Sequence, residues 1–347
     1  MTSTRSVGYA VVGLGAISQV AVLPAFEHAR RARLVALVSG DKGKAEGLAK
    51  KFRAPGHYGY GDYDACLHRP DVDAIYIATP PGAHEEYAVR AAREGKHVLC
   101  EKPLAATAAQ AARMVKACRA RRVRLMTAYR KYFEPASLTL KDIVRRGELG
   151  RVDVIHTLFT EFRPSGDKSP KWLFQRKLAG GGPQMDLGVY CVNTTRWLID
   201  EDPVRASAIS WAHDKKRFRE VEEGVAYRLD FPSGVLMQGT STYGSALASF
   251  LNVHGEKGWA SLCPAYAFEQ ERRLRLESAS GRFEKTFGTL DEFALELDAF
   301  SDCILKGRDP EPDGYEGLKD LVIIEAIYRS ARTGRPVPIR YPSRTGV

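Results

Sequence analysis

Short apolar runs alternate with amphipathic stretches over the first 128 residues. Runs of this kind, rich in Val, Ile, Leu and Ala, are typical of strands buried on both faces. The predicted strands are residues 9–12, 34–38, 74–78, 98–100 and 124–128. The predicted helices are residues 42–52, 85–94 and 108–121, with Gly95 as the C-terminal cap of the second. This alternation predicts a parallel α/β sheet with its ligand at the carboxyl edge.

The pattern changes after about residue 150, where several runs alternate apolar and polar positions. Alternation with a period of two is typical of an antiparallel sheet with one covered face. The predicted strands are residues 152–162, 205–212, 225–231, 235–242, 250–254 and 273–277, with a tight turn at Pro232-Ser233-Gly234. The predicted helices are residues 183–199, 291–306 and 317–333. We therefore predict an α/β domain over 1–128 and an α+β domain over 129–347, whose last helix could pack back on the first domain.

Length and composition agree with two ordinary globular domains. The chain has 347 residues, of which 44% are hydrophobic and 27% charged. No run reaches the length of a membrane-spanning helix, and the few residues before the first strand leave no room for a secretory signal. The six cysteines are scattered, without C-x-x-C or metal-ligand spacing. We expect a cytoplasmic protein with reduced cysteines, no metal site and no membrane partner.

The formal net charge of +10 is spread along the whole length. A nucleic-acid surface would concentrate Lys and Arg on one element. A dispersed positive charge instead attracts small anions such as nucleotide cofactors. Nucleic acid is therefore not the expected partner.

A glycine motif, Gly13-Leu14-Gly15-Ala16-Ile17-Ser18, follows the first predicted strand and opens a helix. Two glycines allow a tight turn and close approach of a pyrophosphate to the helix N-terminus. Such glycines can also serve a purely steric need in a strand-to-helix turn. The motif lies at the start of an alternating strand–helix region, and this place favours a dinucleotide site that uses Gly13, Gly15, Ala16 and Ile17.

The second predicted strand ends in Ser39-Gly40-Asp41-Lys42-Gly43-Lys44. An acid near this position binds the ribose 2′-hydroxyl of NAD, and Asp41 could do so or could cap the next helix. A hydroxyl with ammonium groups suits a 2′-phosphate better. We therefore predict NADP, bound by Ser39, Gly40 and Lys44, with NAD as the alternative.

Two further strand ends carry candidate residues. Thr79, Pro80 and His84 follow one strand, either as a simple turn with a helix cap or as part of the nucleotide cleft, which we favour. Glu101-Lys102-Pro103 ends another strand at the same edge. Most lysines are surface groups, but one held between an acid and a proline at this edge is a candidate for catalysis.

A second glycine-rich segment, Gly180-Gly181-Gly182, precedes a predicted helix that carries Asp186, Tyr190 and Asn193. Asp186 and Tyr190 are four residues apart and would share a helix face. The three polar groups could be a structural hydrogen-bonded trio. We favour a role in binding a hydroxylated substrate, because oxidation of an alcohol needs a base for the hydroxyl proton. A nearby lysine favours tyrosinate, so Lys102 and Tyr190 suit each other chemically, with Asp186 orienting the substrate.

These motifs together, with Tyr129-Arg130, resemble the glucose–fructose oxidoreductase/inositol dehydrogenase family over nearly the whole chain. The resemblance implies a Rossmann domain followed by an open, mostly antiparallel sheet that mediates homo-oligomers, dimers or tetramers. It also implies that Lys102 is the catalytic lysine, that Asp186 contacts substrate, and that Arg130 clamps cofactor or substrate. Tyr190 is similar to the glucose–fructose oxidoreductase branch, since many members carry histidine there. That branch has an export signal and an N-terminal arm, and we expect neither here.

The resulting hypothesis is an NADP-dependent oxidoreductase that transfers hydride between nicotinamide and the C1 hydroxyl of a glucose- or xylose-like aldose, or a sugar carbonyl. Tyr190 would be the base or acid, and Asn193 a further substrate ligand. The alternatives are a sugar–sugar oxidoreductase with tightly bound NADP and a non-catalytic NADP-binding regulator. The sequence alone does not identify the sugar, the physiological direction or the oligomeric state.

Overall fold

The computed structural model describes residues 5–279 and 281–347, which form two compact units. The first unit contains the chain up to Arg130, Asp291–Leu318 and Ser343–Val347, and the second contains Lys131–Leu290 and Lys319–Pro342. The first segment of the first unit ends at Arg130, two residues beyond the predicted boundary at residue 128. Two later segments of the chain also belong to the first unit.

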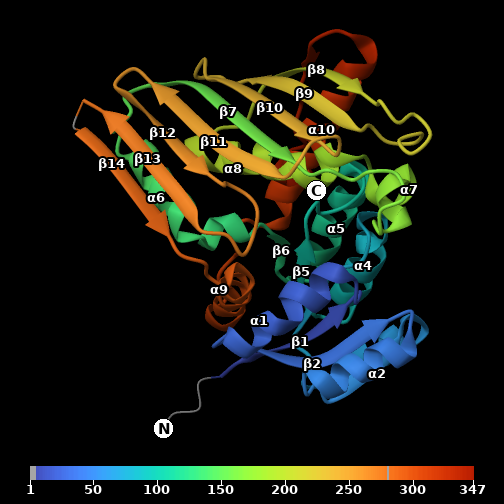
Figure 1. Cartoon of the computed structure of the whole chain (residues 1–347). Helices are drawn as coiled ribbons and strands as arrows, with labels where there is room; N and C mark the ends of the chain where they lie inside the picture. The colour runs from blue at the N-terminus through green and yellow to red at the C-terminus, as the bar shows by residue number, and fades with distance from the viewer. Residues whose placement is uncertain (1–4, 280) are drawn as a thin grey trace. The chain divides into compact units, whose positions relative to one another are not determined.

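The first unit contains a six-stranded sheet in the order β3-β2-β1-β4-β5-β6, and every pair is parallel (Figure 1). Its strands are β1 (Val7–Val12), β2 (Ala32–Ser39), β3 (Gly56–Gly59), β4 (Ala74–Ile77), β5 (His97–Glu101) and β6 (Leu125–Ala128). The central strands β1 and β4 are buried along their whole length, as expected when helices cover both faces. The predicted parallel α/β sheet is confirmed.

The helical segments of the first unit are η1 (Ser18–Val22), α1 (Leu23–His28), α2 (Lys42–Lys51), η2 (Tyr60–Asp62), α3 (Tyr63–Leu67), η3 (Pro81–Ala83), α4 (His84–Arg93), α5 (Ala108–Ala120), α9 (Glu292–Lys306) and η7 (Arg344–Gly346). The four with predicted bounds, α2, α4, α5 and α9, start and stop within one residue of those bounds. Gly95 follows α4 with φ +70°, in agreement with its predicted capping role. The sequence did not reveal β3, a short strand with glycine at both ends, which forms by pairing with Ala36–Ser39 of β2.

The second unit contains a nine-stranded sheet in the order β14-β13-β12-β11-β7-β10-β9-β8-β15 (Figure 1). Its strands are β7 (Val152–Thr160), β8 (Arg205–Trp211), β9 (Gly224–Asp230), β10 (Leu236–Thr242), β11 (Ala248–Gly255), β12 (Gly258–Cys263), β13 (Arg272–Ser278), β14 (Gly281–Phe287) and β15 (Val337–Pro338). The pair β7–β10 is parallel and the others are antiparallel, so the predicted mostly antiparallel sheet is confirmed.

One face of this sheet packs against helices and the other is open. The helical segments that begin in or belong to this unit are α6 (Pro135–Arg145), η5 (Lys171–Phe174), α7 (Arg176–Ala179), η6 (Gln184–Gly188), α8 (Val189–Ile199) and the later part of α10 (Gly314–Thr333), while η4 (Arg130–Phe133) joins the two units. Contacts of α6 with β12 and β13, and of α8 with β7 and β10, cover one face. In β13, Leu274 is buried on that face while Arg273 and Arg275 are exposed on the other. Exposed β14 has no apolar alternation, which explains why the sequence did not indicate it.

The predicted single helix over residues 183–199 is two helical segments. It begins as a π-helical turn, η6, and continues as α8. Hydrogen bonds in a π-turn span five residues, so the four-residue rule that placed Asp186 and Tyr190 on one face does not apply across this junction. No helix among residues 5–279 and 281–347 is long and apolar enough to cross a bilayer.

Candidate functional site

The two glycines of the first motif meet different requirements. Gly13 has φ +93°, and a Cβ there would lie 2.6 Å from the main-chain oxygen of Ala78. The Ser18 hydroxyl, in place of a third glycine, donates a 2.6 Å hydrogen bond to the Gly13 carbonyl. A Cβ on Gly15 would meet no atom within 4 Å. Gly13 therefore serves the packing of the loop, and Gly15 leaves open space beside it.

That open space lies where helical backbone begins. Residues Ala16 and Ile17 are already helical, ahead of η1. The first N–H groups of a helix have no partner within it and carry partial positive charge, so they suit a pyrophosphate. The small, exposed Gly15 beside these donors fits a dinucleotide at this loop.

The end of β2 shows how each residue of the predicted 2′-phosphate segment is used. Asp41 caps α2, because its carboxylate accepts a 2.9 Å hydrogen bond from the Lys44 main-chain N–H. The helix-cap alternative for Asp41 is thus confirmed. The Lys42 ammonium lies 3.3 Å from the Asp62 carboxylate. Ser39 is buried at the strand end, and its hydroxyl accepts from the Asp41 N–H at 3.2 Å. Ser39 and the exposed Lys44 remain the groups suited to a phosphate.

His84 connects the segments that follow β4 and β5. It is fully buried, with Nε2 2.7 Å from the Thr79 carbonyl oxygen and Nδ1 3.2 Å from that of Leu104. Burial lowers the pKa of His84 to about 4, so the ring is neutral near pH 7, and the shorter contact favours a proton on Nε2. The side chain thus positions main chain at the strand ends. Its predicted contact with the cofactor stays a prediction.

Thr79 adds a group that suits a ligand. Its hydroxyl is buried and has no hydrogen-bond partner among the described residues. Buried hydroxyls are rarely left in that state, and such a group at the carboxyl end of a strand in a parallel sheet suits a bound ligand. Pro80, in extended conformation, leads from Thr79 into η3.

Glu101 is the buried last residue of β5. Its carboxylate accepts hydrogen bonds from the Tyr76 hydroxyl at 2.8 Å and from the Lys102 main-chain N–H at 3.2 Å. Burial raises the pKa of Glu101 despite these bonds. The peptide between Lys102 and Pro103 is cis. Glu101 therefore holds the main chain that carries Lys102 at the edge of the sheet.

Arg130 lies in a buried group of carboxylates within the first unit. Its guanidinium is ion-paired with Glu292 of α9, and both side chains are almost fully buried. Glu296, one turn further along α9, has no hydrogen-bond partner for either carboxyl oxygen among the described residues. Burial raises the pKa of Glu296 well above its usual value. Glu292 holds the Arg130 guanidinium. The contact of Arg130 with cofactor or substrate stays a prediction.

Asp186, in η6, has two partners in the second unit that the sequence did not indicate. The Tyr243 hydroxyl donates a 2.7 Å hydrogen bond to Asp186, and the Arg163 guanidinium lies 4.0 Å from the same oxygen and over the Tyr243 ring. Arg163 and Tyr243 come just after the ends of β7 and β10, the one parallel pair of this sheet. The rule that ligands gather at the carboxyl ends of parallel strands could have found them.

Tyr190 and Asn193 both belong to α8 and are buried. The Tyr190 ring lies 6.1 Å from those of Tyr266 and Phe159, stacked on the first. Asn193 donates a 2.8 Å hydrogen bond to Asp320 of α10. Asn193 and Asp186 therefore have separate partners within this unit, and the predicted substrate contacts of Tyr190 and Asn193 stay predictions.

The triple-glycine segment is packed against a buried carboxylate. A Cβ on Gly181 would lie 2.0 Å from the Tyr328 hydroxyl, and one on Gly182 would lie 2.2 Å from the Glu222 carbonyl oxygen. The Glu222 carboxylate accepts from the N–H groups of Gly182 and Gln184 at 3.0 and 3.2 Å. Close backbone approach thus explains these glycines, and Glu222 holds the start of the helix that carries Asp186.

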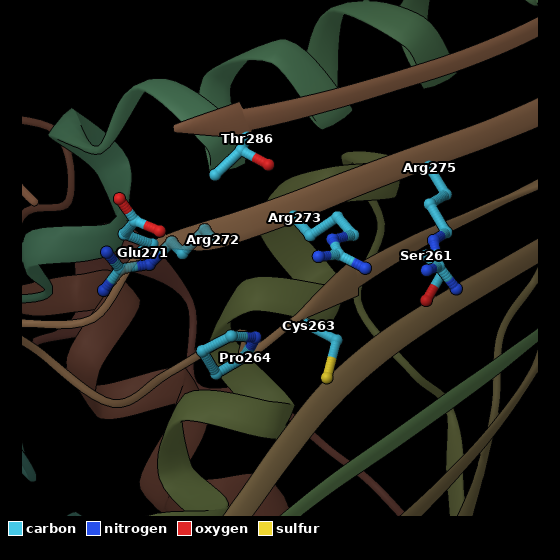
Figure 2. Close-up of a pocket in the computed structure, with 8 residues that line it drawn as sticks. All are labelled: Ser261, Cys263, Pro264, Glu271, Arg272, Arg273, Arg275 and Thr286. Carbon is cyan, nitrogen blue, oxygen red and sulfur yellow. The ribbon is translucent and has the colours of Figure 1, made fainter. Parts of the chain in front are cut away.

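A cavity of about 290 Å³ lies on the open face of the nine-stranded sheet (Figure 2). Its lining includes Ser261, Cys263, Arg273 and Arg275, which alternate with buried residues on β12 and β13. It contains none of the predicted site residues. In the part of the chain that the structure describes, no three His, Cys, Asp or Glu residues are grouped to hold a metal ion.

Known proteins match the chain in both of its parts. Residues 7–129 match an oxidoreductase family with an NAD-binding Rossmann fold, and residues 137–261 match the GFO/IDH/MocA C-terminal domain. The NADP-dependent D-xylose 1-dehydrogenase of Haloarcula marismortui is 32% identical over 94% of this chain and 91% of its own length. These matches cover both sheets described above.

Solved structures agree in fold. The aldose–aldose oxidoreductase of Caulobacter crescentus, complexed with glycerol, is 38% identical, has a TM-score of 0.91 and covers 96% of this chain and 100% of its own. The 3-ketoreductase KijD10 of Actinomadura kijaniata, in complex with NADP and TDP-benzene, is 26% identical with a TM-score of 0.82, over 94% of this chain and 98% of its own. The chain is therefore a member of the Gfo/Idh/MocA family of oxidoreductases, as the resemblance in its motifs indicated.

Proposed function

We propose that the protein is an NADP-dependent oxidoreductase that acts on the C1 hydroxyl of an aldose, or in reverse on a sugar carbonyl. The observation that carries this proposal is similarity across both units to an NADP-dependent D-xylose 1-dehydrogenase. The Lys102, Asp186 and Tyr190 set, which suits proton transfer, is present as well. Bound NADP supplies the hydride acceptor.

The protein's own residues would bind the sugar and move its proton. Tyr190 takes the hydroxyl proton, and the positive charge of Lys102 favours the ionised phenol. Asp186, held by the hydroxyl of Tyr243 and lying near Arg163, accepts hydrogen bonds from sugar hydroxyls. Glu101 fixes the main chain on which Lys102 is carried. A non-catalytic regulator would have no need of this proton-transfer set.

The preference for NADP over NAD rests on Ser39 and Lys44. With Asp41 used as a helix cap, these two groups are left to meet a 2′-phosphate. Replacing Ser39→Asp should lower the kcat/KM ratio for NADP over NAD at least tenfold, because a carboxylate repels phosphate and accepts from a ribose hydroxyl. The kcat/KM ratio is measured by steady-state kinetics with each cofactor, and Ser6→Asp is the matched control. An unchanged ratio would place the 2′-phosphate elsewhere.

The direct test is to mix purified protein with NADP or NAD and a panel of aldoses and polyols. Reduction of NADP by a pentose or hexose aldose, followed at 340 nm, is the expected result. Product analysis for the lactone identifies C1 as the oxidised carbon. Absence of reduction by every aldose, combined with absence of reduced-cofactor consumption by sugar carbonyls, would reject the proposed function.

A sugar–sugar oxidoreductase with tightly bound NADP is the second candidate. Similarity at 38% identity to an aldose–aldose oxidoreductase over the full length of that chain favours it. Denaturing the freshly purified protein and measuring released nucleotide tests it. One nucleotide per chain, with sugar exchange in the absence of added cofactor, would support this candidate over a simple dehydrogenase.

We propose further that the protein is a cytoplasmic homo-oligomer that associates through the open face of the nine-stranded sheet. Exposed Ile209 and Leu236 lie on that face, as do Ser261, Cys263, Arg273 and Arg275 beside the cavity in Figure 2. Apolar side chains on an uncovered sheet are typical of an interface. Light scattering after gel filtration measures the mass, and Ile209→Lys should shift it toward one chain of 38.4 kDa.

A further inference from the structure

A second cavity, of about 350 Å³, lies within the second unit between the segment after β7 and the segment after β8. Asp167, Ser169, Lys171, Phe174 and Gln175 line it from the first segment, and Lys216, Arg217, Arg219 and Glu220 from the second. Its volume is in the lower range of small-molecule sites. None of the residues predicted from the sequence lines it.

The lining carries a surplus of positive charge. Its four basic side chains exceed its two acidic ones, and the two acids already have partners. Asp167 pairs with Arg217, and Glu220 lies 3.6 Å from Arg219. No ion pair joins Lys171 or Lys216 to a carboxylate in the described part of the chain.

Arg217 is built into the wall of this cavity. Its side chain is 11% exposed, lies 4.3 Å over the Phe174 ring and is held by Asp167. Its Nε has no hydrogen-bond partner among the described residues. A guanidinium fixed by one carboxylate and stacked on a ring is well suited to a planar or tetrahedral oxyanion.

The cavity is adjacent to the partners of Asp186. Phe174, in its wall, packs against the Tyr243 ring with centroids 6.3 Å apart, and Tyr243 donates to Asp186. Ser169 accepts a 2.9 Å hydrogen bond from Arg163, which also lies near Asp186. The Tyr243 ring and the Arg163 guanidinium therefore lie between the basic cavity and Asp186, the carboxylate that we assign to the sugar.

We propose that this cavity binds an anionic group carried by the substrate, so that the protein acts on an aldose with a phosphate or carboxylate away from C1. The inference rests on the proposed function for the identity of the sugar end. Lys171 and Lys216 supply point charges and Arg217 supplies directed donors, while Asp186 binds hydroxyls. A neutral aldose would contact only Asp186 and its neighbours, and would leave Lys171 and Lys216 without an anion to bind.

The test measures binding apart from turnover. The NADPH-loaded enzyme, which holds no hydride acceptor for oxidation of an aldose, is titrated calorimetrically with glucose, glucose 6-phosphate, glucuronate and inorganic phosphate, and with xylose and xylose 5-phosphate. At least one anionic aldose should bind tenfold or more tightly than its neutral parent, and more tightly than inorganic phosphate. The double variant Lys171→Ala/Lys216→Ala should remove that preference without changing kcat for neutral aldoses. The matched control Lys257→Ala/Lys285→Ala, which removes two exposed lysines from elsewhere in the same unit, should retain it.

The outcomes separate this inference from the proposed function. Equal affinity for neutral and anionic aldoses, or a preference that survives the double variant, overturns the anion site. Inorganic phosphate binding as tightly as any anionic aldose overturns the claim that the sugar is part of the ligand. Tight, lysine-dependent binding of an anionic aldose without NADP reduction rejects the proposed function and supports the anion site. Turnover of neutral aldoses without any preference for anionic ones supports the proposed function and rejects the anion site.

Discussion

In the first unit, His84 and Lys102 are positioned through contacts with residues near them in the sequence, although Arg130 is held by the distant side chain of Glu292. In the second unit, Asp186 and Asn193 are both held by distant side chains. The neutral His84 ring donates from Nε2 to the Thr79 carbonyl, five residues away, and the Glu101 carboxylate accepts from the N–H of Lys102. Asp186, by contrast, is held by Tyr243, 57 residues away. Asn193 is held by Asp320, 127 residues away.

The difference reflects the two kinds of sheet. In a parallel α/β sheet, each strand ends in a short loop at the same edge, so local motifs define the site. In the nine-stranded sheet, β7 pairs with β10 and β11 across long stretches of the chain, so the groups that meet at the ends of these strands depend on strand order and register. Four predictions test this contrast, in order of decreasing effect.

Removal of one reacting group from each unit should have the largest effect. Lys102→Ala and Tyr190→Phe should each lower kcat about a hundredfold or more, the usual size of an acid–base contribution. Lys116→Ala, which removes an exposed lysine of the same unit, is the control. Wild-type turnover in either variant would remove that residue from the proposed chemistry.

His84 should make the stability of the first unit sensitive to acid. Burial lowers the pKa of His84 to about 4, from 6.5 in the unfolded chain. As pH falls from 6.5 to 4, the unfolded chain takes up a proton that the folded chain does not, which reduces the free energy of unfolding by about 3 kcal/mol. In urea melts across this range, His84→Gln should give a flatter pH dependence than wild type, and exposed His57→Gln should not. Parallel curves for His84→Gln and wild type would contradict the assignment.

The two motif glycines should respond differently to the same added methyl group. Gly13→Ala should reduce the free energy of unfolding by about 2 kcal/mol or more, because φ is positive and Ala78 blocks the Cβ. Gly15→Ala should leave stability within about 0.5 kcal/mol but weaken NADP binding. Chemical denaturation and fluorescence titration measure the two effects. Equal loss of stability in both variants would reject the distinction.

Tyr243→Phe should have the smallest effect and tests the side-chain contacts of the second unit. Loss of a hydrogen bond to a carboxylate should lower kcat/KM for the aldose about tenfold, without loss of stability large enough to unfold the protein. Tyr341→Phe, whose hydroxyl donates to the Pro203 carbonyl instead, is the matched control. Equal kinetics for Tyr243→Phe and wild type would mean that Asp186 needs no such partner.

The sequence by itself determined the features that depend on neighbouring residues. Apolar runs with intervening helices predicted the parallel sheet, and Gly13 with Gly15 predicted the loop after β1. For Asp41 the sequence offered a ribose ligand or a helix cap, and the hydrogen bond to the Lys44 N–H, three residues on, decided for the cap. The family followed from motifs of this local kind.

Only the tertiary structure decided which distant groups meet. It joined Arg163 and Tyr243 to Asp186, set Glu222 against the triple-glycine segment, and formed the basic cavity between two loops. Strands without an apolar pattern, such as β3 and β14, formed because a neighbouring strand offered hydrogen bonds. Such contacts depend on strand order and register, which short-range periodicity does not encode.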